Sequence, residues 1–253
     1  DTWFDSGSMP YAMNGYIGEG EITQFPADFI AEMVEQTRTW FYYQHVLGTA
    51  LYNQPVFKNA VATGVILAED GRKMSKKLQN YPDPMHIFDT YGADALRLYI
   101  TTSPVVQAEN LNFSEKDLQT MVRNTFRMLW NSYSFFTTYA SIDNWSPSPK
   151  ATEDHGLSNN ILDRWVLSEL QVLIEKMTEE LENYKPAQAA RLIAPFVDDL
   201  SNWYIRRSRK RFWKNENDND KNAAYQTLHT VLVELSKLMA PFTPFMAEEM
   251  YRN

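Results

Sequence analysis

The residues best suited to chemistry lie in a short basic stretch that follows a turn signal. The dipeptide Asp70-Gly71 is typical of a tight turn, and the lysine-rich string KMSKK occupies residues 73–77 directly after it. Paired ammonium groups on a mobile loop can clamp a polyphosphate and offset the charge that builds as pyrophosphate leaves. A lysine run alone is more often a solvated surface loop, but this string after a strand and a turn favours the phosphate role. We therefore predict that Lys73 and Lys76 act on phosphates, that Ser75 tightens the turn and that Met74 packs inward.

A second candidate site for a polyanion lies at residues 203–214, WYIRRSRKRFWK, which combine six positive charges with aromatic side chains. Cations at a helix C-terminus also complement the helix dipole, so capping accounts for some of them. Their density exceeds what capping needs, and contact with RNA phosphates, with aromatic stacking beside it, is the preferred interpretation. The predicted RNA-binding residues are Arg206, Arg207, Arg209, Lys210 and Arg211.

The first half of the chain must position the lysine loop through alternating strands and helices. Patterns of apolar spacing predict a strand at 28–32, a helix at about 36–52, a strand at 61–67 buried on both faces, and a helix at about 93–102. Strand, helix, strand and helix in this order are typical of part of an α/β sheet with crossover connections.

The second half reads as a helical bundle with short loops. Ser114 is expected to begin a helix that reaches about residue 140, and a linker follows at 145–150. Ser158 is expected to cap the next helix, and Pro186 to begin a third that reaches about Lys214. Pro195 should kink or break that third helix, and a fourth spans about 222–240.

Composition narrows the class of protein. The 253 residues carry a net charge of −8 and contain no cysteine, which excludes disulfides and Cys-ligated zinc. The four histidines show no metal-ligand spacing, so we expect no metal site. No apolar run approaches the roughly 20 residues of a membrane span, and a reducing cytoplasm fits this composition. The chain begins and ends inside ordered-looking patterns, and we expect it to be a piece of a longer polypeptide.

The string KMSKK resembles the KMSKS signature of the class I aminoacyl-tRNA synthetases, with Lys77 in place of the final serine. Three further stretches resemble the isoleucyl enzymes of that class: DTWFDSGSMP at residues 1–10, the segment at 25–41, and YGADALR at 91–97. The resemblance covers essentially the whole chain. Valyl enzymes share YGADALR but differ at the residues matching 5–8, and they remain the nearest alternative.

The resemblance implies a fold in two parts. Residues 1–103 would form the later part of a Rossmann-type α/β catalytic domain that carries the KMSKS-like loop. Residues 104–253 would form an α-helical anticodon-binding bundle, truncated at its C-terminus. No HIGH-like string, the other signature of the class, occurs in the sequence. The chain alone is therefore expected not to form an adenylate.

The same resemblance implies roles for individual residues. Lys76 would contact ATP phosphates, Lys73 would act in the transition state, and Ser75 and Met74 belong to the same loop. Gly64 and Val65 would offer backbone groups to adenine. Glu32 would contact the aminoacyl-adenylate, while Glu35 and Gln36 would hydrogen-bond the ribose or the adenylate. Met33 and Thr39 stand where the family usually has glycine, which leaves close backbone approach at these two positions open.

Trp3 and Trp40 resemble two indoles that form the walls of the isoleucine side-chain pocket in the isoleucyl enzymes. From composition alone, both are more simply explained as core aromatics. A pocket with flat apolar walls would distinguish isoleucine from valine by about 1–3 kcal/mol only, because the two differ by one methylene.

The implied reaction is the ATP-dependent ligation of isoleucine to tRNA(Ile) through an isoleucyl-adenylate. Its partners would be ATP with Mg²⁺ held chiefly by the nucleotide, isoleucine and tRNA(Ile), with no membrane contact and a monomeric, cytoplasmic enzyme. An alternative from another class is a non-catalytic RNA-binding module, but Glu32, Gln36 and Lys76 would then have no purpose.

Overall fold

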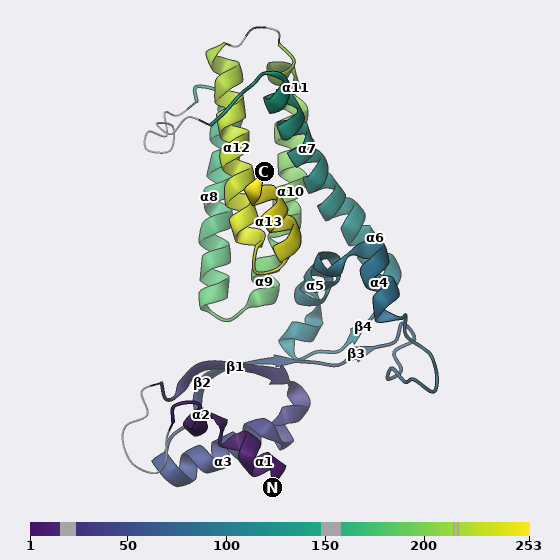
Figure 1. Ribbon diagram of the computed structural model, residues 1–253, viewed down its shortest axis with the longest axis vertical. Coiled ribbons are helices and arrows are strands. Elements are labelled where there is room, and N and C mark those ends of the chain that lie inside the picture. The colour runs from purple at the N-terminus through teal and green to yellow at the C-terminus, as the bar shows by residue number, and fades with distance from the viewer. Residues whose placement is uncertain (16–23, 148–157, 215, 217) are drawn as a thin grey trace. The chain divides into compact units, whose positions relative to one another are not determined.

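The computed structural model describes residues 1–15, 24–147, 158–214, 216 and 218–253 (Figure 1). The chain divides into two compact units, each described by itself below. Unit 1 comprises Asp1–Leu78 and Ser103–Phe113, and unit 2 comprises Gln79–Thr102 and Ser114–Asn253. These units are not the predicted domains, whose boundary at 103/104 stays a prediction.

Unit 1 is built around a parallel β-α-β crossover. Strand β1 (Ala27–Met33) pairs with β2 (Phe57–Thr63), and the connection runs through the 3₁₀ turn η1 (Val34–Arg38) and helix α3 (Trp40–Tyr52). The predicted first strand and the helix after it are confirmed, although the helix begins at Trp40 because the preceding turn is tighter than an α-helix. Helices α1 (Thr2–Gly7) and α2 (Met9–Ala12) belong to the same unit, and α1 packs on α3, where a Cβ on Gly7 would lie 3.0 Å from the Cβ of Tyr43.

The prediction of one strand at 61–67 is wrong. Strand β2 ends at Thr63. The chain then enters a second parallel sheet, in which β3 (Ile66–Leu67) pairs with β4 (Leu111–Asn112). The 3₁₀ turn η2 (Pro104–Gln107) precedes β4 in the sequence. The change of sheet occurs at Gly64, whose backbone approaches that of Glu109 so closely that a Cβ would lie 1.9 Å from the Glu109 carbonyl oxygen. The expectation of burial on both faces also fails, because no residue of β2 is buried.

Unit 2 is helical in the residues described. The helix pair α4 (Pro84–Tyr91) and α5 (Ala93–Thr102) comes first, and α5 confirms the predicted helix at 93–102. The other helices are α6 (Glu115–Met121), α7 (Arg127–Ile142), α8 (Ile161–Glu182), α9 (Pro186–Arg191), α10 (Ile193–Asp198), α11 (Arg206–Phe212), α12 (Asn219–Met239) and α13 (Pro244–Arg252). Wide π-helical turns, η3 (Val122–Phe126) and η5 (Asp199–Ile205), join α6 to α7 and α10 to α11.

The core of the bundle lies where α7, α8, α12 and the α9–α11 run face one another, and its central side chains are almost fully buried. Leu129, Leu170, Leu200, Leu228 and Leu235 have no exposed surface. Burial of such apolar side chains is the main source of stability in a bundle.

The helix boundaries predicted for this half are confirmed at some points and wrong at others. Ser114 caps α6, with its Oγ accepting the Asp117 N–H at 3.2 Å. Ser158 does not cap α8, because Asn160 accepts the Leu162 N–H instead and the Ser158 hydroxyl donates to Asp163.

The predicted interruption near Pro195 is confirmed by the boundary between α9 and α10 at Leu192. Residues 148–150 of the predicted linker lie outside the described residues.

Candidate functional site

The carboxyl ends of β1 and β2 bring several predicted site residues to one edge of the parallel sheet. Glu32 lies opposite Ala62 in the register, and Met33 lies opposite Thr63, directly before Gly64. The side chain of Glu32 is exposed, and its Oε2 accepts the Met33 N–H at 3.1 Å. Open parallel sheets bind ligands outside the carboxyl ends of their strands, so a ligand site is expected at this edge.

Gln36 has a structural task that sequence reasoning missed. Its Oε1 accepts hydrogen bonds from the Thr39 hydroxyl at 2.5 Å and from the Trp40 N–H at 3.1 Å. Thr39, the residue at the N-cap position, makes no capping bond itself, so Gln36 satisfies the first turn of α3. No hydrogen bond of the Gln36 amide nitrogen is found among the described residues, so this group can donate to a ligand, and Glu35 beside it is exposed.

The backbone N–H groups of Gly64 and Val65, two residues predicted to meet adenine, already have hydrogen-bond partners within the chain. The Gly64 N–H donates to the Val105 carbonyl at 2.6 Å, and the Val65 N–H donates to the Asn110 side chain at 3.2 Å. The Val65 carbonyl accepts the Leu111 N–H at 3.0 Å. Adenine could use either amide only by displacing a partner within the chain, and the expectation that backbone groups of Gly64 and Val65 meet adenine stays a prediction.

The lysine loop begins at a well-braced turn. Gly71 has φ +79°, a conformation that favours glycine, and its N–H donates to the Ala68 carbonyl at 2.9 Å. Asp70 and Arg72 form an ion pair at 2.6 Å, and the hydrogen bonds from Arg72 hold the pKa of Asp70 below its usual value. Lys73 then bridges back to Leu67 of β3. The turn signal of Asp70-Gly71 is thus confirmed, and the turn fixes where the lysines begin.

The loop itself presents its lysines outward. The Ser75 hydroxyl accepts the Lys77 N–H at 3.2 Å, which tightens the chain as expected, and Met74 is partly buried. Lys73, Lys76 and Lys77 are exposed. Within the part of the chain that the structure describes, the ammonium group of Lys76 has no hydrogen bond or ion pair, so it is available to an anionic ligand.

The two tryptophans of the predicted side-chain pocket lie on packed helices. Trp40, partly buried at the start of α3, donates its Nε1–H to the Ser6 carbonyl of α1 at 3.2 Å. Trp3 stacks on Tyr43 with 6.2 Å between ring centroids and 9° between planes. Trp3 remains 41% exposed, which argues against the alternative that it is a core aromatic.

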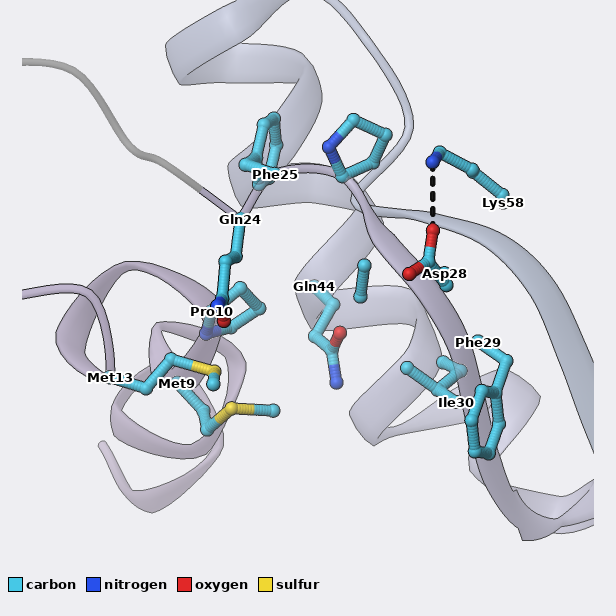
Figure 2. Close-up of a pocket in the computed structure, with 12 residues that line it drawn as sticks. Met9, Pro10, Met13, Gln24, Phe25, Asp28, Phe29, Ile30, Gln44 and Lys58 are labelled. Carbon is cyan, nitrogen blue, oxygen red and sulfur yellow. Dashed lines mark hydrogen bonds and ion pairs between the residues drawn. The ribbon is translucent and has the colours of Figure 1, made fainter.

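A cavity of about 560 Å³ opens elsewhere in unit 1 (Figure 2). It borders the first four residues of β1, whereas Glu32 lies near the other end of that strand. Its lining comprises Met9, Pro10, Met13, Gln24, Phe25, Pro26, Ala27, Asp28, Phe29, Ile30, Gln44 and Lys58, with none of the predicted site residues. Gln44 points into it with both amide atoms buried and without a hydrogen-bond partner in the described residues. We assign neither the amino acid nor the nucleotide to this cavity.

Unit 2 carries the predicted basic cluster on α11 and the turn before it. Arg206, Arg207, Arg209 and Lys210 are all exposed. The Arg207 guanidinium lies 3.7 Å from the ring centroid of Trp203, which is itself 46% exposed. A cation held over an exposed indole presents charge and a flat surface together, which suits a nucleic acid strand. These four residues are named the basic face below.

Arg211 does not belong to the basic face, and the prediction that it binds RNA is corrected. Its side chain is buried and donates to Asp163 at 2.6 and 2.7 Å and to the Asp220 carbonyl at 2.9 Å. Burial would lower the pKa of Arg211, but the hydrogen bonds and charge of Asp163 outweigh it and raise the pKa. Asp163, which sequence reasoning missed, is a charged residue within the apolar stripe of α8, and that was the signal for a buried partner.

Neither a metal site nor a membrane span is found in the described ranges. No three His, Asp or Glu side chains come together there in a way that could hold a metal ion. None of the helices described is long and apolar enough to cross a membrane.

Comparison with known proteins agrees with this arrangement. Residues 1–112 match the family of tRNA synthetases class I (I, L, M and V), and residues 163–253 match the anticodon-binding domain of tRNA ligases. The whole chain is 52% identical to an isoleucine–tRNA ligase of Bdellovibrio bacteriovorus and 50% identical to one of Chlamydia muridarum, and it covers 24% of each. The chain thus spans about a quarter of the length of these curated relatives.

Solved structures share the fold at lower identity. A methionyl-tRNA synthetase of Mycobacterium tuberculosis in complex with methionyl-adenylate matches 98% of this chain with a TM-score of 0.77 at 18% identity, over 48% of its own length. The LeuRS of Agrobacterium radiobacter, in a ternary complex with tRNA and LeuAMS, matches 100% with a TM-score of 0.70 at 20% identity, over 31% of its length. These likenesses confirm a class I catalytic fold followed by a helical bundle.

Proposed function

The chain belongs to the class I aminoacyl-tRNA synthetases, and we propose that it is part of a longer enzyme that attaches isoleucine to tRNA(Ile) with ATP. The observation that supports this most strongly is the 52% identity over the whole chain to a protein named isoleucine–tRNA ligase. The matched region covers the whole chain and so includes both the lysine loop and the basic face.

In the proposed first step, isoleucine attacks the α-phosphate of ATP, and pyrophosphate leaves. Lys76, whose ammonium group is exposed and unpaired within the described residues, neutralises charge that builds on the leaving pyrophosphate. Lys73 acts beside it at the end of the braced turn. Because this stabilisation grows in the transition state, it raises the rate of the chemical step more than the affinity for ATP.

The adenylate is held at the carboxyl edge of β1 and β2. Glu32 is the exposed carboxylate at that edge, and the Gln36 amide nitrogen is the donor left over after its oxygen has capped α3. Glu35 is exposed next to Gln36 and provides a second acceptor for ribose hydroxyls. These contacts orient the adenylate for transfer to the tRNA hydroxyl.

Trp3 and Trp40 form the apolar walls for the isoleucine side chain. The hydrogen bond from Trp40 to Ser6 fixes the indole against α1, and the stacking of Trp3 on Tyr43 fixes the other ring on α3. Flat rigid walls suit a branched aliphatic chain, and the polar Nε1–H of Trp40 is already paired with Ser6.

The basic face supplies the phosphate contacts for tRNA. Its four exposed cations, with Trp203 beneath Arg207, give a local positive surface on a chain whose net charge is −8. Affinity for a polyanion follows such local charge through counterion release and not the total charge.

Several finer points belong to the same proposal. The enzyme is cytoplasmic and monomeric, uses Mg²⁺ bound to ATP, and needs no zinc within these residues. The valyl enzymes are the second candidate because they share the motif at 91–97, but DSGS at residues 5–8 favours isoleucine.

The test is aminoacylation by the complete protein that contains these residues. Purified enzyme would be incubated with tRNA, ATP and labelled isoleucine, valine, leucine or methionine in parallel. We expect stable charging with isoleucine only. Charging with valine and not with isoleucine would support the valyl alternative, and no charging with any of the four would support a non-catalytic RNA-binding module.

A further inference from the structure

Helix α5 carries two charged residues that bind the corner between α12 and α13. Asp94 is nine-tenths buried, and its carboxylate accepts the Met246 N–H at 2.7 Å and the Phe245 N–H at 3.4 Å. Arg97, one turn further along α5, donates to the Phe242 carbonyl at 3.1 Å and to the Pro241 carbonyl at 3.0 Å. Four hydrogen bonds thus join a helix at 93–102 to a corner about 150 residues away in sequence.

The two side chains complement the corner in charge. Met239 ends α12, so the carbonyls of Pro241 and Phe242 continue the negative end of that helix, where a cation is favourable. Phe245 and Met246 lie in the first turn of α13, where free N–H groups and the positive end of the dipole favour an anion. Thr243, the N-cap of α13, makes no capping bond of its own, so Asp94 caps that helix from another helix.

Asp94 and Arg97 lie in the segment YGADALR, to which none of the roles above assigns a task. The same helix α5 follows the lysine loop in sequence, with only α4 between them. The corner it binds follows α12, which packs with α11, the helix that carries the basic face. Within unit 2, Asp94 and Arg97 thus fasten the segment that leaves the lysine loop to the α12–α13 corner of the bundle, and the hydrogen bond from Arg191 of α9 to the Thr102 carbonyl at 2.7 Å joins the far end of α5 to the same bundle.

We propose that Asp94 and Arg97 are positioning residues that fasten the bundle to the segment following the catalytic loop, and that they serve transfer of the amino acid to tRNA and not adenylate formation. The proposal rests on the proposed function. Adenylate formation needs the lysine loop and the sheet edge, which both lie in unit 1. Transfer needs tRNA held by the bundle while its end reaches the adenylate, so it depends on how firmly the bundle is held.

The experiment compares two activities of the complete enzyme in the same preparations. Isoleucine-dependent ATP–pyrophosphate exchange reports adenylate formation, and aminoacylation at varied tRNA concentration reports transfer. We expect Asp94→Ala and Arg97→Ala to lower kcat/KM for tRNA by at least about ten-fold, because a misplacement of about 1 Å far from the chemistry can cost about 10²-fold. Exchange should stay near the wild-type rate.

Conservative variants separate positioning from a general loss of structure. Asp94→Asn keeps a side-chain oxygen that caps a helix nearly as well, so it should restore most of the transfer activity. Arg97→Lys keeps the charge but not the planar fork that reaches two carbonyls, so it should restore less. Lys116→Ala on α6 is the matched control, because the exposed ammonium group of Lys116 has no ion pair or hydrogen bond among the described residues, and the substitution should change neither activity.

Three results would overturn the proposal: a parallel fall in exchange and transfer, unchanged kinetics for tRNA in both alanine variants, or an Asp94→Asn enzyme as impaired as Asp94→Ala. If Asp94→Ala does not fold, Arg97→Ala decides alone, since the Arg97 side chain is exposed and the carbonyls it leaves can be hydrated. Failure of the wild-type enzyme to activate or charge isoleucine would instead count against the proposed function, and the roles of Asp94 and Arg97 would then be tested with whichever amino acid it charges.

Discussion

The guanidinium of Arg211 donates two hydrogen bonds to the buried carboxylate of Asp163, at 2.6 and 2.7 Å, and so locks α11 against α8. The Tyr204 hydroxyl donates to the same carboxylate at 2.8 Å. The pair lies directly beneath the basic face, and one turn of helix separates Arg211 from the exposed Arg207. Of the six cations at 203–214, Arg211 therefore serves stability, Lys214 pairs with Asp218 and Asp220, and the four of the basic face are exposed to a ligand.

Removing Arg211 should destabilise the bundle strongly. Arg211→Ala leaves the Asp163 charge buried without its partner, and breaking a buried pair in this way costs about 3–5 kcal/mol. Denaturant unfolding followed by circular dichroism would measure the loss. The matched control is Arg209→Ala, an exposed cation on the same helix, which should stay within about 0.5 kcal/mol of wild type. Equal stabilities for the two variants would show that the pair does not hold α11 in place.

Acid should weaken the end of the bundle where α12 begins. Burial opposes ionisation of Asp143, but hydrogen bonds from Lys221 and Tyr225 outweigh it and hold the pKa of Asp143 below its usual value. Burial would raise the pKa of Asp220, but hydrogen bonds from Arg211 and Lys214 outweigh it and lower the pKa. Hydrogen bonds from the Lys221 N–H and from Lys214 lower the pKa of Asp218.

A carboxyl whose pKa is depressed by folding contributes stability that is present above its unfolded value of about 3.9 and lost as pH falls through the folded value. The unfolding free energy should therefore decline below about pH 4. Asp143→Asn removes one of these groups, so its stability should fall less steeply with acid than that of wild type. Parallel curves for the two proteins would rule out a contribution from Asp143.

Lys76→Ala should slow adenylate formation with little effect on isoleucine binding. Loss of one group that stabilises transition-state charge typically costs about 10²–10³-fold in rate. Pyrophosphate exchange by the complete enzyme would give the rate and the KM for isoleucine. Lys77→Ala is the neighbouring control and should change the rate far less. A wild-type rate for Lys76→Ala would remove this lysine from the mechanism.

The basic face should account for much of the salt dependence of tRNA binding. Replacing Arg206, Arg207, Arg209 or Lys210 with alanine should weaken binding and flatten the plot of log affinity against log salt by about one unit per lost phosphate contact. Fluorescence anisotropy at several salt concentrations would measure both quantities. Lys176→Ala, an exposed cation on α8, is the control. If all four variants keep the wild-type slope, tRNA is held elsewhere.

Trp40→Ala should raise the KM for isoleucine and weaken the preference for isoleucine over valine, because one apolar wall is lost. Trp40→Phe keeps a flat apolar wall but loses the hydrogen bond to Ser6, so it should retain most of the preference. Steady-state exchange kinetics with both amino acids would compare the variants. Equal loss of preference in the two would mean that the bond to α1, and not the wall, carries the effect.

Features that depend on neighbouring residues were predictable from the sequence. The turn at Gly71, the Ser114 cap, strand β1 and helix α5 all follow from local patterns. The cap of α8 is a local exception, because Asn160 takes the place predicted for Ser158. Other features that were missed depend on distant contacts. The end of β2 at Gly64 follows from the backbone of Glu109, and the burial of Arg211 follows from a carboxylate 48 residues away.

In the candidate site, too, the residue types could be predicted from the sequence, whereas contacts between distant residues could not. Its lysines, carboxylates and tryptophans could be identified from sequence motifs, because a motif is defined by residue types and their spacing. The engagement of the Gly64 and Val65 amides could not be, since their partners Val105 and Asn110 come from a later segment with no pattern that marks it. Gln36 was chosen as a ligand contact, and its second task at the start of α3 appears only in the structure.

The most direct test of the proposed function is amino-acid-dependent ATP–pyrophosphate exchange by the complete wild-type enzyme. With isoleucine and valine compared at saturating ATP, we expect kcat/KM to favour isoleucine by about 10–200-fold, the discrimination that one methylene allows in an apolar pocket. Leucine and methionine should support little exchange. A preference for valine, or no exchange with isoleucine, would contradict the assignment of this chain to an isoleucine-activating enzyme.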